Sequence, residues 1–258
     1  MLASLRAVWR YRDLVRNLVA RDLRVKYKGS SIGFAWSLVH PVVLAAVYTL
    51  AFKYILDVRL PHFPAFVLSG LLPWNCFAMS LSQATGSVAD NSALVRKVAF
   101  PRIILPLGVV VSQFVQFALM YAVIVPLAGA LGPGLSPAVA ALLPLLLLQL
   151  AFTTGVALLL STAYVYFRDT RHLVDVALQI WFWLTPVVYA VALVPEGWRR
   201  FFWLNPMAGF VTAYQQVVVS GTWPSAAATA ALTGVAVATG LVGLAVFTRH
   251  QRRFAELV

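Results

Sequence analysis

The sequence predicts an all-α membrane protein that crosses the bilayer with six transmembrane helices. Hydrophobic residues make up 61% of the 258 residues and charged residues only 11%, which is too few charges to coat a soluble globule. The apolar residues gather in long runs that can each cross a hydrocarbon core of about 30 Å. The formal net charge is +12, but the basic residues are interspersed with these runs and form no continuous soluble face. We therefore expect the charge to reflect membrane sidedness and expect no nucleic-acid partner.

Residues 1–32 are predicted to form an amphipathic helix that lies in the membrane interface. Tyr11, Val15, Leu18 and Val25 recur at spacings of four, three and seven residues, with arginines on the intervening face. Such a helix buries its apolar face at the lipid boundary and keeps its basic face in water. Arginines interrupt the whole stretch, so it lacks the apolar core of a signal peptide. We expect the N-terminus to be retained on the cytosolic side.

Six apolar runs long enough to form transmembrane helices follow this segment. Pro73 and Asn75 make the second run the most polar, which a helix tolerates where it faces protein or water. With the N-terminus inside, the outer side receives only four cations, Lys53, Arg59, Arg199 and Arg200, so both termini are predicted to be cytosolic. The six predicted spans are 33–56, 64–87, 103–128, 138–166, 173–194 and 226–248.

Residues 195–224, between the fifth and sixth spans, do not resemble an ordinary loop. The segment is too short and too polar in its middle for two full spans. A simple exposed loop would leave Phe201, Phe202 and Phe210 in water. We predict two short re-entrant or interfacial helices on the outer side of the membrane.

The chain lacks the motifs of an enzyme, so we expect no catalytic residue, no metal site and no cofactor in it. It contains no phosphate-binding G-x-x-x-x-G-K-[ST] loop and no H-E-x-x-H or G-x-S-x-G motif. The single cysteine, Cys76, permits no internal disulfide, and the four histidines are scattered singly. All eight acidic residues lie at predicted span ends or in connecting segments, which leaves no acid at mid-membrane for coupling to a proton or sodium gradient. Energy must come from a partner or from a downhill gradient.

Four stretches, found in this order, resemble the ABC-2 type permeases that export polysaccharides. They are residues 21–41 (RDLRVKYKGSSIGFAWSLVHP), residues 91–102 (NSALVRKVAFPR), residues 167–170 with 178–189 (FRDT and LQIWFWLTPVVY), and residues 204–207 (LNPM). The resemblance implies the membrane subunit of an ABC exporter in the bacterial cytoplasmic (inner) membrane. Such permeases are homodimers with two copies of a separate ATPase subunit, which carries ATP and Mg. The implied substrate is a lipid-linked polysaccharide, and the stretches 27–33 and 184–186 resemble the O-antigen and teichoic-acid branch more than the capsule branch.

Two other readings remain open. One is an ABC-2 permease for a drug, lipid or small glycolipid, which a narrow pore poor in aromatic residues would favour. The other is a membrane-bound glycosyltransferase or lipid-modifying enzyme, which needs acids or histidines gathered at one membrane face. Asp169 and Asp175 are six residues apart and give that alternative little support.

The resemblance also assigns residues to functional surfaces. It places the first amphipathic helix and the loop after the second span on the ATPase, which here gives Arg21, Asp22, Arg24, Lys26, Asn91, Arg96, Lys97 and Arg102. It places short gating helices on the outer side, which here gives Trp198, Phe201, Phe202, Trp203, Asn205 and Pro206.

The channel residues follow from the width of the substrate. A hydrated polysaccharide is too wide for one closed helix bundle, so we expect the pore between two protomers, lined by neutral polar and aromatic side chains. Spans one and five supply these side chains, Trp36, Tyr48, Phe52, Gln179, Trp183 and Tyr189. The alternative is that these rings pack inside one protomer. Gln113 and Gln116, which share a helix face, can bind a hydroxyl-rich substrate or, as is more common, join two helices.

Overall fold

The computed structural model describes residues 10–27, 33, 35–58, 60–97, 100–131, 134, 136–202 and 204–257. All regular structure in these ranges is helical, which confirms the predicted all-α class. By length and composition, five helical segments of the described chain can cross a membrane: Ala35–Ile55, Phe63–Gly86, Ile104–Leu127, Pro137–Tyr166 and Ala226–Leu257. The chain is a multi-pass membrane protein.

The helices alternate with short connections. They are α2 (Arg12–Tyr27), α3 (Ala35–Tyr48) with a π-helical extension (Thr49–Ile55), α4 (Phe63–Gly86), α5 (Ser92–Lys97), α6 (Ile104–Leu131), α7 (Leu142–Tyr166) preceded by a 3-10 turn (Pro137–Ala141), α8 (Thr170–Trp183), α9 (Glu196–Phe202), α10 (Pro206–Gln215) with a π-helical extension (Gln216–Ser220), α11 (Ala226–His250) and α12 (Phe254–Leu257).

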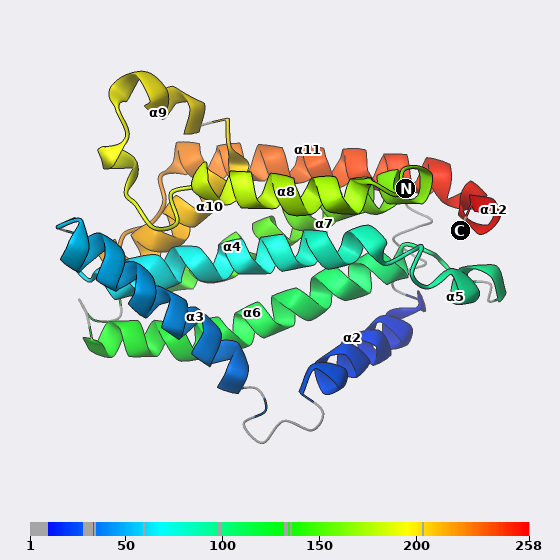
Figure 1. Ribbon diagram of the computed structural model, residues 1–258, viewed down its shortest axis with the longest axis horizontal. Helices are drawn as coiled ribbons and strands as arrows, with labels where there is room; N and C mark the ends of the chain where they lie inside the picture. Colours follow the sequence, from blue (N-terminus) through cyan, green and yellow to red (C-terminus); the bar gives the residue numbers. More distant parts are fainter. Residues whose placement is uncertain are drawn as a thin grey trace.

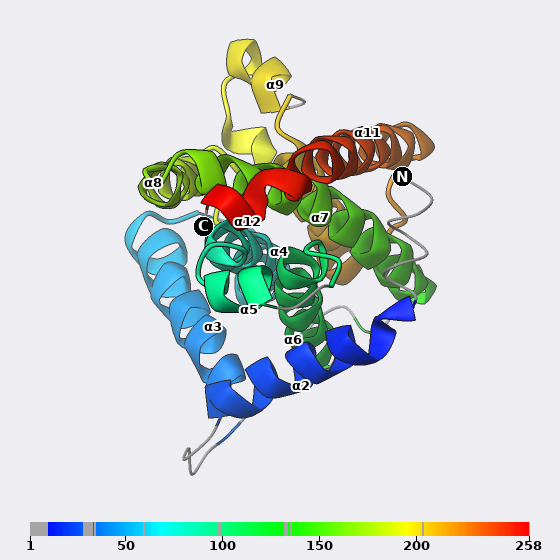
Figure 2. The same ribbon diagram turned by 90° about the vertical axis from the view of Figure 1, so that its right-hand side faces the viewer.

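The long helices α4, α6, α7, α8 and α11 run along the longest axis of the molecule (Figure 1). Helix α4 is central, since it packs against α3, α6, α7, α8 and α10. Helices α5 and α12 lie at one end of this bundle and α9 lies at the other. Helix α2 lies crosswise to the bundle and packs against α6 (Figure 2). We call the end that carries α5 and α12 the basic end, for the cations described below.

The apolar face of α2 docks on a small hydrophobic cluster at the basic end. Tyr11, Leu14, Val15 and Leu18 pack there against buried residues of α5, α6, α7, α11 and α12. Val25 was expected on the same face, but it is 68% exposed, so the packed face ends before the last turn of α2. Residues 1–9 and 28–32 of the predicted amphipathic segment lie outside the described residues.

Helix α4 contains Pro73, which has no amide hydrogen and so leaves the carbonyl of Ser69 without its helical donor. The hydroxyl of Tyr121 on α6 donates to that carbonyl at 2.7 Å. The side-chain amide of Gln149 on α7 donates to the carbonyl of Pro73 at 2.8 Å. Neighbouring helices therefore satisfy the backbone of α4 where proline interrupts it, as a segment without access to water requires.

Helix α8 is shorter than the span predicted over 173–194. It has 14 residues and ends at Trp183, before the turn that contains Pro186. At 1.5 Å per residue it is about 21 Å long, less than a hydrocarbon core of about 30 Å. A single helix therefore does not occupy the range 173–194, and the number of six spans stays a prediction.

Side chains satisfy the carbonyls that this turn releases. Asn205 donates to the carbonyl of Leu184 at 3.0 Å, and Gln215 donates to that of Pro186 at 2.9 Å. The hydroxyl of Tyr189 donates to the carbonyl of Trp183 at 2.7 Å. The turn is therefore tied to α10, which supplies Gln215 and begins directly after Asn205.

Helices α7 and α11 approach so closely that glycine is required on both. A Cβ atom on Gly155 would overlap the backbone of Thr239, and one on Gly243 would overlap the backbone of Gly155. We predict that Gly155→Ala and Gly243→Ala each destabilise the protein by about 1–3 kcal/mol, because the helices must separate. The midpoint of thermal unfolding in detergent measures this. Gly234→Ala is the matched control on α11, since its Cβ meets nothing within 4 Å, and it should raise the midpoint slightly. Equal shifts of the midpoint in all three variants would contradict the close approach of α7 to α11 at Gly155 and Gly243.

Candidate functional site

The residues predicted to face an ATPase lie on α2 and at the basic end. Arg24 on α2 and Arg96 on α5 are exposed, as are Arg252 and Arg253 directly before α12. Arg21 is also exposed and pairs with its neighbour Asp22 at 3.2 Å. The side chain of Lys97 lies outside the described part of the molecule.

Two of the predicted ATPase contacts make bonds inside the protein. The guanidinium of Arg102 donates to the backbone carbonyl of Gln251, which ties the start of α6 to the segment before α12. The side-chain amide of Asn91 donates to the carbonyl of Ser87 at 2.8 Å and stabilises the turn between α4 and α5. Both residues hold the basic end together.

An ion pair that sequence reasoning missed joins the basic end to α8. Arg171, in the first turn of α8, contacts Asp90 at 2.5 Å, and its guanidinium lies 4.8 Å from the ring centre of Tyr164. One turn further along α8, Asp175 accepts a hydrogen bond of 2.8 Å from Ser82. Asp90 directly precedes the predicted ATPase loop, so α8 is connected to that loop. The only sequence signal was that both charges were placed on the cytosolic side.

The predicted channel residues separate into two groups. Tyr48, Phe52 and Tyr189 make contacts inside the protomer. The ring centre of Tyr48 lies 6.3 Å from that of Phe182, and the ring centre of Phe52 lies 6.4 Å from that of Phe63. Tyr189 bonds the turn after α8, as described above. The other three channel residues, Trp36, Gln179 and Trp183, are exposed.

The exposed members belong to rows of apolar side chains on α3 and α8. The row on α8 consists of Leu173, Val176, Ile180 and Trp183, and the row on α3 includes Trp36, Val39, Val43, Val47 and Leu50. The spacings of three and four residues give each helix one continuous exposed face. Figure 2 shows α3 and α8 on the same side of the bundle.

The segment 195–224 forms two helices with different surroundings. Helix α9 is largely exposed, including Trp198 and Phe201, while Trp203 lies outside the described residues. Helix α10 packs against α4, α7 and α11 and buries most of one side. Its buried residues include Met207, Phe210, Val211 and Tyr214.

Asn205, predicted as an outer-gate residue, joins these elements. Its side-chain oxygen accepts from the amide of Met207 at 3.0 Å, and so caps α10 beside Pro206, and from the indole of Trp181 at 2.7 Å. Its side-chain nitrogen donates to the carbonyl of Leu184 and to the hydroxyl of Thr185. One side chain thus connects the end of α8 to the start of α10.

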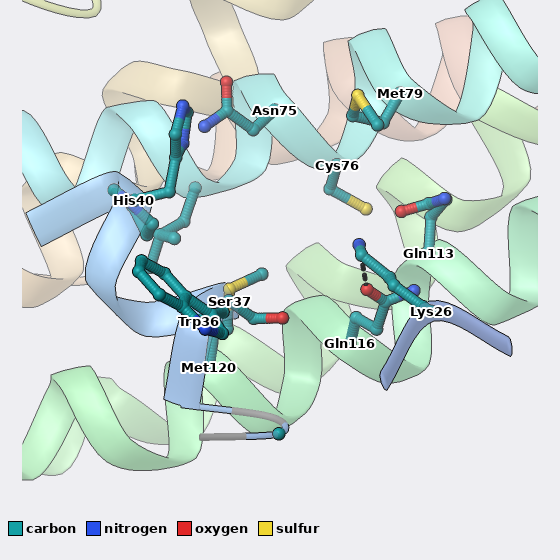
Figure 3. A pocket seen from close by; sticks show the side chains of 13 residues that line it. Lys26, Trp36, Ser37, His40, Asn75, Cys76, Met79, Gln113, Gln116 and Met120 are labelled. Atoms are coloured by element: carbon teal, nitrogen blue, oxygen red, sulfur yellow. Dashed lines mark hydrogen bonds between the residues drawn. The ribbon is translucent and has the colours of Figure 1, made fainter. Parts of the chain in front are cut away.

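A cavity of about 530 Å³ lies between α2, α3, α4 and α6 (Figure 3). Its polar lining includes Lys26, His40, Asn75 and Gln113, and the ammonium of Lys26 donates to the side-chain oxygen of Gln116 at 2.5 Å. Gln113 in turn donates to Gln83 on α4 at 2.8 Å, so this glutamine does join two helices. Lys26, which was expected at the ATPase surface, is exposed, and its ammonium points into this cavity.

Comparison with known proteins identifies the family. Residues 13–219 match the ABC-2 type transporter family. The chain belongs to this family. It is 33% identical to the O-antigen export system permease protein RfbA of Myxococcus xanthus, over 100% of both chains. It is 30% identical to the RfbA protein of Klebsiella pneumoniae over 95% of each chain, and 20% identical to the polysialic acid transport protein KpsM of Escherichia coli over 92% and 93%. The predicted resemblance to ABC-2 permeases is confirmed.

For this ABC-2 transporter chain we predict that Asn205→Ala lowers the free energy of unfolding by about 1–2 kcal/mol, since it removes a helix cap and the partner of the Leu184 carbonyl and of the Trp181 indole. Asn205→Asp keeps the side-chain oxygen that caps α10, so it should lower the free energy of unfolding less. Thermal unfolding of the purified protein measures both, with Asn17→Ala on α2 as an exposed control of the same residue type. A loss of transport with unchanged stability in Asn205→Ala would instead indicate a direct gating role.

Proposed function

We propose that the chain is the transmembrane subunit of an ATP-driven exporter of a lipid-linked polysaccharide of O-antigen or teichoic-acid type. The observation that carries the proposal is the similarity to an O-antigen export permease over the whole of both chains. Shared length matters here, because a permease for another substrate class can share the membrane core yet differ in its ends and outer segments. Export of labelled glycan by cells that carry or lack the gene tests the proposal. Export of a drug or small lipid in place of glycan would favour the alternative substrate class.

The proposed orientation puts both termini in the cytosol of a bacterium, with the protein in its cytoplasmic (inner) membrane. Helices α2 and α5 and the turn before α12 carry many cations, whereas the end opposite α5 and α12 carries Lys53, Arg199 and Arg200 among the described residues. This asymmetry follows the rule that cytosolic segments are enriched in lysine and arginine. The sixth crossing is proposed to consist of α8 with the turn bonded by Asn205 and Gln215, a discontinuous segment held by protein contacts.

Energy is proposed to come from two copies of a separate ATPase subunit that binds ATP and Mg, docked on the exposed basic surface of α2 and α5. The sequence contains no phosphate-binding loop, so hydrolysis requires another chain. The ion pair of Asp90 with Arg171 then gives a direct connection from the docking loop to α8.

The pore is proposed to lie between two protomers, along the exposed faces of α3 and α8. Both faces lack a partner within the described chain, and both contain tryptophan among aliphatic residues. Trp36, Gln179 and Trp183 are the predicted channel residues that point out of the protomer, so they are retained as channel candidates. Helices α9 and α10 are proposed to form the outer gate, with exposed α9 as its movable part and buried α10 as its anchor.

The first test of this function concerns energy coupling. We predict that the purified chain hydrolyses no ATP and that it co-purifies with an ATPase subunit in equal copy number. A phosphate-release assay on the chain alone and on the complex checks this, with an ATPase variant lacking its phosphate-loop lysine as the control. Hydrolysis by the isolated chain would overturn the assignment of ATP to a partner.

The second test concerns the dimer face. In a Cys76→Ala background, we predict that Trp183→Cys on α8 is cross-linked to a second copy by a short bis-maleimide in native membranes. Val242→Cys on α11 is the matched control, since it is similarly exposed, at 53% against 57% for Trp183, on a different helix. Gel electrophoresis reports the dimer. Cross-linking at position 242 and none at position 183 would place the interface elsewhere.

A further inference from the structure

The cavity between α2, α3, α4 and α6 contains a lysine at an unexpected depth. Lys26 contacts Gln116, which is twelve residues into α6 and so about 18 Å from its first residue, at 1.5 Å per residue. The cavity wall also includes Leu72 and Met79 of the membrane-spanning α4. Lys26 is an exposed residue of α2, but its ammonium is turned into this cavity and bonds there at a partly buried position. A cation that faces a cavity in this way suits an anionic ligand.

No described carboxylate supplies that anion. The ion pairs found in the described chain join Arg21 to Asp22, Arg171 to Asp90 and Arg199 to Glu196. Asp22 lies one helical turn before Lys26 and pairs with Arg21 instead. Partial burial lowers the pKa of the Lys26 ammonium below its ordinary value, because it removes water from the charged form.

The surroundings of Lys26 combine donors with apolar walls. Figure 3 shows the side chains of Gln113 and Gln116 beside the ammonium and the sulfur of Cys76 pointing toward it. Trp36, which is 53% exposed, also lines the cavity. Charge, amides and a tryptophan ring suit a ligand with an anionic group, hydroxyls and an attached apolar chain.

The volume restricts the ligand further. About 530 Å³ is within the range of about 300–1,000 Å³ that small-molecule sites occupy. A polysaccharide chain does not fit in this space, but one end of it does. The chemistry required is a phosphate ester at the junction of a sugar and a lipid.

We propose that this cavity binds the phosphate-bearing head of the lipid-linked substrate, with Lys26 contacting the phosphate and Gln113 and Gln116 contacting phosphate or sugar oxygens. The inference rests on the proposed export function and adds a recognition site within one protomer, which shares Trp36 with the pore proposed between protomers. The site recognises the end of the polymer that enters with its lipid, so it accounts for selection of a lipid-linked chain without contact to the sugar repeat.

The binding test uses the assembled transporter in dodecyl maltoside, titrated with dodecyl phosphate. The two amphiphiles share a dodecyl chain, so binding above the detergent background reports the phosphate. Native mass spectrometry counts bound molecules, and the rise of the unfolding midpoint with concentration gives the affinity. We expect Lys26→Gln to weaken binding by about tenfold or more, because a charge-assisted hydrogen bond is lost, and Lys26→Arg to retain it. Arg16→Gln removes the same charge from an exposed position of α2 and should bind as the native chain does.

A second variant separates binding from folding. Gln116→Glu places a carboxylate beside the ammonium and supplies the missing counter-ion from within the protein. We expect it to raise the unfolding midpoint and to abolish binding of dodecyl phosphate. Native affinity in both Lys26→Gln and Gln116→Glu would overturn the proposal, whatever their stability.

Competition identifies the source of the phosphate. Glycolipid substrate extracted from producing cells should displace dodecyl phosphate, whereas phosphatidylglycerol should not. Displacement by phosphatidylglycerol alone would make the cavity a site for a bilayer lipid and overturn its assignment to the substrate.

In cells, Lys26→Gln should reduce glycan export while the complex assembles normally. Normal export in that variant would refute this site and leave the export function intact, whereas absence of glycan export by the native complex would refute the function itself.

Discussion

Where Pro73 and the turn after α8 interrupt the helices of this protein, other parts of the protein bond the backbone, because lipid offers it no hydrogen bonds. Four neutral side chains meet this requirement. Tyr121 and Gln149 bond the carbonyls around Pro73 in α4, and Asn205 and Gln215 bond those of the turn after α8. These bonds hold α4, α6, α7, α8 and α10 in one arrangement. A proline or a turn in such a segment is therefore inseparable from a polar residue elsewhere in the chain.

This constraint explains which parts of the fold could be predicted from the sequence. Five spans are recognisable because hydrophobic length is a local property of the chain. The range 173–194 is apolar enough to suggest a sixth, but Pro186 disfavours helix at the preceding residue and the helix stops at Trp183. The proline was visible in the sequence, whereas its compensating partners, Asn205 and Gln215, are about twenty to thirty residues further along. No local pattern connects them.

The candidate sites also divide into residues that a local property of the sequence identifies and residues whose role depends on long-range contacts. The family resemblance placed Arg24 and Arg96 on a surface, and both are exposed, since solvated charge is also a local property. Arg102 and Asn205 are also polar but bond inside the protein, because tertiary contacts decide which polar groups are used structurally. Lys26 shows the limit most clearly. The resemblance placed it on the ATPase surface, and the crosswise packing of α2 also brings its ammonium to Gln116 in the middle of α6.

The ion pair of Asp90 with Arg171 and the hydrogen bond of Lys26 to Gln116 differ in their exposure to water, and this difference suits an exporter. Asp90 and Arg171 form an exposed pair, which contributes only about 0–1 kcal/mol in water. Such a pair can open and close in each transport cycle at little cost, so α8 can move when the loop before α5 is displaced. The bond of Lys26 to Gln116 is partly buried, and breaking it leaves the ammonium without its acceptor unless an anion takes its place. A phosphate entering the cavity is such an anion. Substrate binding would then lower the cost of releasing α2 from α6, so movement of this helix, which is proposed to face the ATPase, would depend on the presence of a lipid-linked chain.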